Sequence, residues 1–297
     1  MSDAQWTAYR LTLKLLTPMH IGWRKVGNLH QTRFYVPART MWGALTSRLA
    51  RETEAKDYAE IGRQVNDNLR LSYFYFIDQP EVELNCCYST GGWPWSVDGQ
   101  DKANATLFEW KYLNSYAGSP ITEQQVAEEG GLHETEHIMP FTREGKQVYL
   151  TGWVFERKQL DESIANWKEA IIRIQLGSER SYGWGRVAPP DKDVLKNMLI
   201  ETKKMFGANL ELDNDNPEVV LPKDAFITSH VDANELIPDD FEGRMEMLAG
   251  RLTTDAARYG RNFTPLTPCW TPGTGVKKEK RFAIGYNGIW CVCEGYN

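Results

Sequence analysis

The segment GSERSYGWGRV at 177–187 constrains this chain more than any other part of its sequence. Two glycines, Gly183 and Gly185, stand on either side of Trp184, and an arginine lies beyond each of them. Glycine allows backbone conformations and close approaches that a side chain would prevent. Arginine pairs with phosphate, and aromatic rings stack on nucleobases. The segment therefore predicts a loop that contacts a polyanion through its main chain, and RNA is the leading candidate.

The uneven distribution of charge supports the same ligand, although the chain carries a net charge of −6. Residues 1–51 contain eight Lys or Arg residues and one acid, which gives this stretch a charge of +7. Residues 191–260 contain fifteen acids and eight bases, which gives a charge of −7. Because local potential governs the binding of polyanions, the basic N-terminal stretch is the expected ligand face. The acidic stretch is either an ordinary solvated face or a surface that docks a basic neighbour.

Composition excludes several other classes of protein. The 297 residues are 41% hydrophobic and 25% charged, as in ordinary globular proteins. No run approaches the roughly 18 apolar residues that span a bilayer, and the start lacks a basic region followed by a small-residue cleavage site. The five cysteines lack CxxC spacing, so a reducing cytoplasm fits them better than a disulfide framework or a zinc site. We therefore expect a cytoplasmic protein with no membrane partner, metal or cofactor.

The hydrophobic patterns predict a mixed α+β fold. They indicate a strand at 7–16, a basic loop at 20–33, a helix from Thr40, a hairpin of strands at 69–77 and 82–89, a strand at 146–157, a helix after Asp161 and a strand near Arg186. This order fits a ferredoxin-like, RRM-like βαββαβ core within residues 1–190, with an insertion at about 90–140. Residues 191–297 form either an acidic, β-rich C-terminal extension or a second small domain. Short helices are expected at 121–129 and 191–206.

Four phrases in a fixed order carry a resemblance to a known family. They are LTLKLLTPMHIG at 11–22, FYVPARTMWGALTSRLAR at 34–51, FTREGKQVYLTGWVF at 141–155 and the segment at 177–187. Together they resemble the RAMP superfamily, the repeat-associated RNA-binding subunits of CRISPR effector complexes. Ala38 and Arg39 depart from the glycine and serine that are usual at those positions. The resemblance implies an RRM-like fold that holds crRNA by its backbone.

The predicted RNA contacts come from three stretches of the chain. These are the basic loop after the first strand, the start of the following helix, whose main-chain amides favour phosphate, and the glycine-rich segment. The full predicted set is His20, Gly22, Arg24, Lys25, His30, Arg33, Arg39, Thr40, Arg48, Arg180, Ser181, Tyr182, Gly183, Trp184, Gly185 and Arg186. For Tyr182 and Trp184, packing into the core is the competing interpretation.

The stretch 17–39 contains no Asp or Glu, and this selects among the roles that the superfamily offers. Subunits of this kind that cut target RNA resemble one another in having an aspartate in this loop, where it serves metal-assisted or acid–base chemistry. We therefore expect a non-cleaving crRNA-binding structural subunit of a type III CRISPR effector complex, which caps the 5′ tag or a terminal backbone position. Its partners would be crRNA, the backbone and large subunits and, indirectly, target RNA. No catalytic residue is favoured.

Three alternatives stay open at this point. A precursor-processing endoribonuclease would use His20 and His30 as acid and base for metal-independent attack by a 2′-hydroxyl. A free-standing RNA-binding protein would need no partner subunit. The HETEH sequence at 133–137 matches the HExxH pattern of zinc proteases. However, the glycines before it and Pro140 after it leave room for only one or two helical turns, so a strand or loop is expected there.

Overall fold

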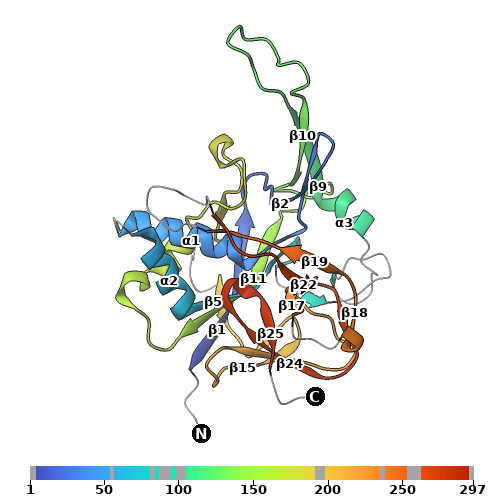
Figure 1. Cartoon of the computed structure of the whole chain (residues 1–297). Helices are drawn as coiled ribbons and strands as arrows, with labels where there is room; N and C mark the ends of the chain where they lie inside the picture. Colours follow the sequence, from blue (N-terminus) through green and yellow to red (C-terminus); the bar gives the residue numbers. More distant parts are fainter. Residues whose placement is uncertain are drawn as a thin grey trace.

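The computed structural model forms three principal β-sheets and a small group of helices (Figure 1). It describes residues 5–53, 57–80, 84–86, 95–97, 105–190, 198–234, 238–252 and 262–293. Strands predominate in these stretches and helices are few, so the expected mixed α+β character is confirmed.

The first sheet is built around two long strands, β1 (Trp6–Leu15) and β11 (Tyr149–Arg157), which pair antiparallel along their length. The sheet has the order β12-β1-β11-β6-β4, with β12 at Val187–Ala188, β6 at Phe74–Ile77 and β4 at Tyr35–Val36. In addition, β5 (Leu69–Leu71) pairs with β11, and β13 (Leu199–Glu201) pairs with β1. All of β6 is buried, so this sheet is covered on both of its faces.

Different parts of the chain cover the two faces. Three helices that pack on one another cover the first: α1 (Ala38–Glu52), α2 (Tyr58–Asn68) and α4 (Trp167–Ile171). On this face the rings of Tyr9 and Trp167 lie 6.5 Å apart. Tyr9 pairs with Val154 across the strands, so the neighbouring Trp153 points to the opposite face. There its ring lies 4.3 Å from that of Phe206, in the C-terminal part of the chain. The first sheet is thus the middle of three layers.

The C-terminal part forms an eight-stranded sheet in the order β14-β15-β16-β24-β25-β17-β22-β19. Its strands are β14 (Lys204–Met205), β15 (Ala208–Glu211), β16 (Glu218–Leu221), β17 (Val231–Asp232), β19 (Met245–Leu248), β22 (Thr267–Trp270), β24 (Lys280–Ile284) and β25 (Trp290–Val292). Side chains of the first sheet bond to this part of the chain. The Tyr75 hydroxyl donates to the carbonyl of Thr228 at 2.5 Å, and Trp153 Nε1 donates to that of Lys204 at 2.9 Å. One continuous hydrophobic core therefore includes residues of both sheets.

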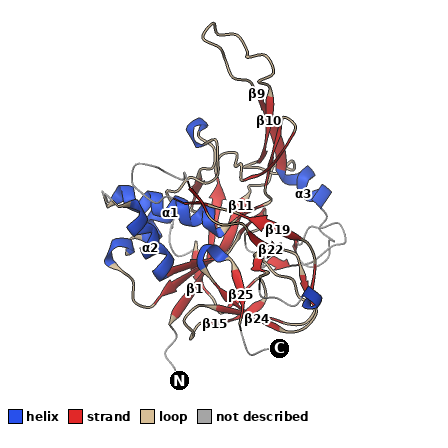
Figure 2. Cartoon of the chain, in the orientation of Figure 1, coloured by secondary structure: helices blue, strands red, loops and turns tan. Residues whose placement is uncertain are grey.

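A third, four-stranded sheet rises from the body as an arm, seen at the top of Figure 1. Its order is β2-β3-β10-β9, with β2 at Gly22–Val26, β3 at Leu29–Thr32, β10 at His133–Ile138 and β9 at Leu113–Gly118. Helix α3 (Ala105–Tyr112) leads directly into β9. Figure 2 shows α3 on the opposite side of the molecule from α1 and α2.

The remaining elements are short. Three strand pairs are β7 (Leu84–Cys86) with β8 (Trp95–Val97), β18 (Phe241–Glu242) with β23 (Gly275–Val276), and β20 (Arg251–Leu252) with β21 (Asn262–Phe263). Single 3₁₀ turns occur at Glu162–Ile164, Arg180–Tyr182, Pro238–Asp240 and Tyr286–Gly288. No helix within the described stretches is long and apolar enough to cross a membrane.

The predicted hairpin of 69–77 and 82–89 is wrong. Strand β7 pairs with β8 instead, whereas β6 lies between β11 and β4. Sequence proximity favoured the hairpin, but the fully buried FYFI of β6 is stabilised between two neighbours inside the first sheet. The rest of 82–89 lies outside the described residues.

Three further predictions, all of helices, relied on local helix preference and differ from the structure. Residues 121–129 form a turn closed by a bridge between Ile121 and Ala127, not a helix. In the helix expected at 191–206, the described part contains strands β13 and β14, while 191–197 lie outside the described residues. The helix after Asp161 is reduced to a 3₁₀ turn and the short α4. In addition, the basic loop at 20–33 is largely the hairpin β2–β3. Pairing with neighbouring strands outweighed local propensity in β13 and in this hairpin.

Candidate nucleic-acid interface

The glycine-rich segment packs against the end of the first strand, so the first and last of the four sequence phrases meet in space. The amide of Ser178 donates to the carbonyl of His20 at 3.0 Å, and the amide of Gly185 donates to that of Pro18 at 2.7 Å. The segment is therefore an ordered wall beside residues 17–20, held by main-chain hydrogen bonds.

Three of its glycines adopt positive φ, and they serve different purposes. Gly177 has a φ of 78°, and a Cβ there would overlap the carbonyl of His20. Gly185 has a φ of 77°, and a Cβ there would overlap the carbonyl of Leu176. Gly183 has a φ of 84°, but nothing lies within 4 Å of the position of its Cβ. Two of the glycines thus allow the chain to pack on itself, and Gly183 alone of the three presents open main chain.

A cleft of about 730 Å³ lies where this contact meets the start of α1 and the C-terminal sheet. From the predicted set it brings together Gly22, Arg33, Arg39 and Thr40. The glycine-rich segment contributes Gly177 and Ser178, and the opposite wall is made of Met247, Leu248, Ala249, Gly250, Arg251, Thr264, Thr267, Asn287 and Ile289. Among the described residues that line the cleft there are three arginines and no Asp or Glu. Its lining is therefore suited to an anion.

The start of α1 opens into this cleft. Pro37 is the N-cap residue, no side chain caps the helix, and its first turn contains no acid. The unpaired amides of a helix start carry partial positive charge, which favours an anion there. Arg39, in the same turn, donates from Nη2 to the carbonyl of Arg251 at 2.5 Å, across the cleft. A phosphate at this place would meet both the helix start and the arginine.

Arg33 also lines the cleft, but its guanidinium is bonded to protein groups. Nη1 lies 2.8 Å from Glu246 Oε1 and 2.8 Å from the Tyr35 hydroxyl. Glu246 Oε1 is also 2.6 Å from His230 Nε2, and His230 Nδ1 is 2.7 Å from the Tyr73 hydroxyl. These five residues, which we call the Arg33 cluster, join the first sheet and its flanking loop to β19 of the C-terminal sheet.

The electrostatics of the Arg33 cluster fix its hydrogen bonds. Burial opposes ionisation of Glu246, but hydrogen bonds from His230 and Arg33 prevail and lower the pKa of this carboxyl to about 2. Burial lowers the pKa of His230. A neutral imidazole therefore donates from Nε2 to the carboxylate and accepts the Tyr73 hydroxyl proton at Nδ1. No buried side-chain polar atom of these five residues lacks a hydrogen-bond partner, so the cluster acts as a structural joint.

The outer turn of the glycine-rich segment points away from the cleft. Arg180 and Ser181 line a shallow depression of about 510 Å³ together with Ser47, Arg51 and Gln175. Tyr182 is 78% exposed and Arg186 is also exposed. Across the described stretches, neither the Arg180 nor the Arg186 guanidinium has a hydrogen-bond or ion-pair partner, whereas Arg51 bonds to Ser47.

Trp184 and the two candidate histidines lie against the arm. The ring of Trp184 is 4.7 Å from that of His137 and 6.3 Å from that of Tyr116. His20 is buried, and its Nδ1 lies 2.6 Å from the carbonyl oxygen of Glu136. The ring of His30 stacks on that of His133 at 5.4 Å, and burial together with Lys25 lowers the pKa of His30. Trp184 and His20 thus pack near the base of the arm, whereas His30, in β3, packs further along it.

The remaining predicted cations lie on β2 and α1. Arg24 is exposed, donates from Nε to Gln31 Oε1 at 2.6 Å and stacks 4.2 Å above the Trp23 ring. Lys25 is exposed on the same strand. Arg48 lies further along α1, where its Nε is 2.5 Å from Glu52 Oε1. These three are placed outside the lining of the cleft.

The HETEH sequence forms strand β10, as a strand or loop was expected, and the zinc-protease interpretation is wrong. That pattern requires both histidines on one helical face. In a strand, residues four apart are separated by about 13 Å along the chain. His133 Nδ1 and His137 Nδ1 instead lie 3.1 Å and 3.4 Å from the carbonyls of Gly131 and Thr135. Among the described residues no group of three or more His, Cys, Asp or Glu could hold a metal.

A smaller pocket of about 250 Å³ adjoins the cleft and shares Trp23 and Arg33 with it. Its charges are mixed: Arg24, Arg33 and Arg244 face Glu109, Glu136 and Glu246. Burial, reinforced by Glu136, raises the pKa of Glu109. The sequence did not point to this pocket, because its lining comes from the hairpin β2–β3, α3 and the C-terminal sheet. The same is true of the C-terminal wall of the cleft, whose only sequence signal was the presence of β-like stretches after residue 219.

These features define a class of protein, a sheet-rich α+β chain whose first-strand end, helix start and glycine-rich segment surround an arginine-lined cleft. Residues 12–188 match the model of the RAMP superfamily, and the chain belongs to this superfamily. No curated protein matches the chain.

The solved structures with a similar fold include chains of the type III-B Cmr-beta complex. One, in the cryo-EM structure bound to cognate target RNA and AMPPnP, has a TM-score of 0.55 at 12% identity and covers 90% of this chain and 86% of its own. A second, bound to cognate target RNA, has a TM-score of 0.38 at 12% identity and covers 61% of this chain and 95% of its own. A third, in the apo state, has a TM-score of 0.37 at 11% identity and covers 66% of this chain and 98% of its own. The first similarity shows that the shared fold extends beyond residues 12–188.

Proposed function

We propose that this chain is a crRNA-binding subunit of a type III CRISPR effector complex that holds RNA without cleaving it. The observation that carries the proposal is the cleft. It combines Arg39 and Arg251 with an uncapped helix start, and its described lining contains no carboxylate. Both features attract phosphate, the recurring charged group of any RNA. Membership of the RAMP superfamily and the fold shared with a Cmr-beta chain support RNA as the polyanion.

The core of this subunit is, in our proposal, ferredoxin-like. The strand order β12-β1-β11-β6 corresponds to the fourth, first, third and second strands of a βαββαβ unit, with α1 and α4 as its helices. Residues 1–190 then form the RNA-binding domain, and strands β9 and β10 of the arm belong to its insertion. Residues 191–297 are an extension rather than a separate domain, because they share a core with the first sheet and complete the cleft.

The non-cleaving role is supported by the state of the nearby acids. Stretch 17–39 contains none, and two carboxylates that reach it from elsewhere are bonded. Glu136 accepts from the amide of Thr32 at 3.1 Å, and Glu246 is part of the Arg33 cluster. Neither is a free base or metal ligand. We further propose that the subunit caps the 5′ tag or a terminal backbone position, since residues 191–297 cover a face of the first sheet.

The partners of this subunit would be crRNA in the cleft, the backbone and large subunits beside it and, through crRNA, target RNA. In the cleft we assign phosphate contacts to Arg39 and Thr40 and to the main chain at Gly22. The exposed Arg180 and Arg186 would continue the contact outside it. His20 and His30 are packed against the arm, and we assign them no chemical step.

Binding of labelled single-stranded repeat RNA to the full chain tests the role of the cleft. Arg39→Ala is expected to weaken binding about tenfold, because a charge-assisted contact to phosphate is lost. Arg63→Ala is the matched control: this exposed arginine of α2 pairs with Glu60, away from the cleft, and its loss should change binding less than about twofold. Equal effects of the two variants would contradict the placement of RNA in the cleft.

Incubation of the same RNA with the wild-type chain in EDTA tests the absence of cleavage. We expect the RNA to stay intact over hours at a protein excess. A single defined product that disappears in a His20→Ala or His30→Ala variant would overturn the non-cleaving role in favour of a precursor-processing nuclease.

A further inference from the structure

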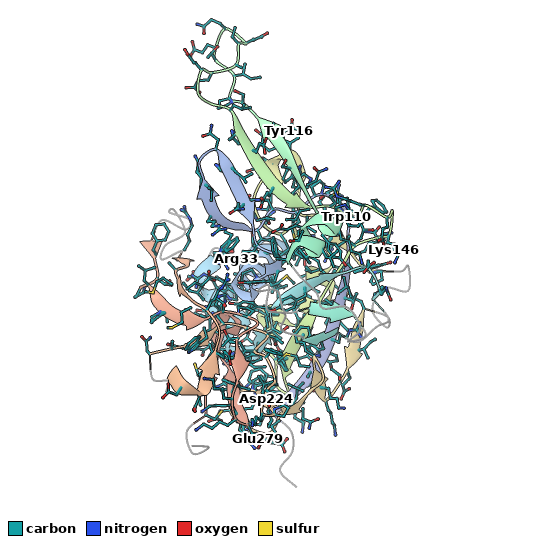
Figure 3. The ribbon with its side chains drawn as sticks, turned by 90° about the vertical axis from the view of Figure 1, so that its right-hand side faces the viewer. Arg33, Trp110, Tyr116, Lys146, Asp224 and Glu279 are labelled. Carbon is teal, nitrogen blue, oxygen red and sulfur yellow. The ribbon has the colours of Figure 1, made fainter. Side chains whose placement is uncertain are left out.

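The arm extends far beyond the body of the molecule. Strands β9 and β10 pair from Leu113↔Ile138 at the base to Gly118↔His133, and residues 119–132 form the tip beyond them. In Figures 1 and 3 this tip projects from the body with no other described segment beside it. Tyr116 lies on the shaft of the arm (Figure 3).

The tip has a defined shape. Main-chain hydrogen bonds join Thr122 N to the carbonyl of Val126 at 2.8 Å and Gln125 N to that of Thr122 at 2.9 Å. Closer to the shaft, Glu128 N donates to the carbonyl of Pro120 at 2.9 Å. The tip is therefore ordered by its own backbone before any partner binds, which lowers the entropic cost of docking.

The apolar residues of the tip face solvent. Ile121 is 70% exposed, Val126 62% and Leu132 59%, and Tyr116 on the shaft is 63% exposed. Ile121, Val126 and Leu132 lie in the tip, beyond the paired strands, which has no core of its own to bury them. Concentrated apolar exposure of this kind marks an interaction site, because burial of each such side chain removes apolar surface from water.

The charge of β9, β10 and the tip between them indicates the kind of partner. Residues 113–138 contain five glutamates and no Lys or Arg. Glu123, Glu128 and Glu129 are exposed at the tip. Such a surface repels the phosphates of RNA and favours a positively charged protein surface. The exposed cations of the arm, Arg24 and Lys25, lie on β2, outside β9, β10 and the tip.

The base of the arm is fixed to the proposed RNA interface. Strand β10 pairs with β3, and Trp184 of the glycine-rich segment packs on His137 and Tyr116. The position of the tip therefore follows that of the RNA-binding segment. The packing suits a structure that holds a partner at a set distance from the cleft.

We propose that the tip of the arm docks into an apolar depression with a basic rim on a neighbouring protein subunit. Ile121, Val126 and Leu132 enter the depression, and Glu123, Glu128 and Glu129 pair with the rim. This inference goes beyond RNA binding, and it rests on the proposed function only in that the chain belongs to an assembly. The arm is a protein-docking element rather than an RNA-binding one.

Photocrosslinking in the assembled complex tests this proposal. A photoreactive residue, p-benzoyl-L-phenylalanine, replaces Val126 in the full chain, which is purified with its co-expressed subunits and crRNA and then irradiated. The expected adduct resists ribonuclease, is digested by protease and maps to a segment of net positive charge. The triple variant Glu123→Lys, Glu128→Lys, Glu129→Lys is expected to reduce its yield at least fivefold. An adduct with RNA, no adduct, or a yield insensitive to this reversal would each overturn the proposal.

The controls separate this result from a failure of RNA binding or folding. A matched reversal of three exposed acids outside the arm, Glu162→Lys, Glu201→Lys and Glu279→Lys, should leave the adduct yield within twofold. Glu279 lies at the opposite end of the molecule from Tyr116 (Figure 3). A second variant joins Gly118 to His133 through Asn-Gly in place of 119–132, a short hairpin turn. We expect it to bind repeat RNA as wild type does and to lose most of the co-purified neighbour; full retention of that neighbour would also overturn the proposal.

Discussion

The cleft and the outer turn of the glycine-rich segment both carry arginines that the sequence assigns to RNA, yet their environments differ. In the cleft, Arg33 is bonded to Glu246 and Tyr35, and its side chain is only 15% exposed. In the outer turn, Arg180 is exposed, with its guanidinium unpaired within the described stretches. The first arginine connects two parts of the protein, and the second is available to a ligand. A cation in a binding motif can therefore serve the fold rather than the ligand.

The difference originates in residues far along the chain. Glu246 and His230, which complete the Arg33 cluster, come from the C-terminal sheet. No residue in the stretch 17–39 indicates that Glu246 and His230 will lie beside Arg33. We therefore expect variants of the Arg33 cluster to lower the stability of the fold. Variants of the outer turn should change only the affinity for the ligand.

The largest expected effect is that of Arg33→Met. Methionine retains an apolar stem but leaves the Glu246 carboxylate, which is only 22% exposed, with His230 as its remaining partner. Breaking a buried ion pair in this way costs about 3 kcal/mol of unfolding free energy. Urea denaturation followed by circular dichroism would measure this difference. The variant Arg48→Met, which removes an i,i+4 pair with Glu52 on α1, should cost only about 0.5 kcal/mol.

A double mutant sharpens this test. Glu246→Gln removes the charge that Arg33→Met leaves unpaired, so the combined variant should be less destabilised than the two single effects added together. Additive losses, or an Arg33→Met cost no larger than that of Arg48→Met, would show that the cluster is no joint between the sheets.

A smaller loss of stability is expected when alanine replaces Gly177 or Gly183, two glycines of one segment that share a left-handed conformation. At Gly177 an alanine would overlap the carbonyl of His20, whereas at Gly183 it would meet open space. Positive φ alone costs an alanine about 1 kcal/mol, so Gly183→Ala should lose about that much. Gly177→Ala should lose about 1 kcal/mol more, because its contact with the carbonyl of His20 must open. Thermal unfolding of both variants measures the difference, and equal losses would contradict the packing role of Gly177.

The parts of the fold set by local pattern were predictable from the sequence. Alternating apolar residues gave β1 and β11, and the amphipathic run from Thr40 gave α1, which begins two residues earlier, at Ala38. The turns of the glycine-rich segment followed from its glycines. These features depend on residues that are neighbours in the chain, so the sequence displays them directly.

Features that depend on distant residues were not predictable. Strand β7 was assigned to β6 because the two are close in sequence, but its partner is β8. Strand β13 was predicted as a helix, because its pairing with β1, almost 190 residues earlier, leaves no local signal. The C-terminal wall of the cleft and the acids of the Arg33 cluster were missed for the same reason. Among the long-range features, the shared site of three stretches was foreseen through the resemblance to a family: the loop after the first strand, the helix start and the glycine-rich segment.

The smallest expected effect distinguishes the outer turn from the cleft. Arg180→Ala with Arg186→Ala should leave the unfolding free energy unchanged within about 0.5 kcal/mol, since both side chains are exposed. Affinity for repeat RNA should fall about tenfold, equivalent to 1.4 kcal/mol. The slope of log affinity against log salt should become shallower by about 1.4, because each lost phosphate contact to a single strand contributes about 0.7. Lys203→Ala with Lys223→Ala removes the same charge from the C-terminal part and should alter neither quantity. If both double variants weaken binding equally, the outer turn contributes only net charge, and its unpaired arginines make no contact with RNA.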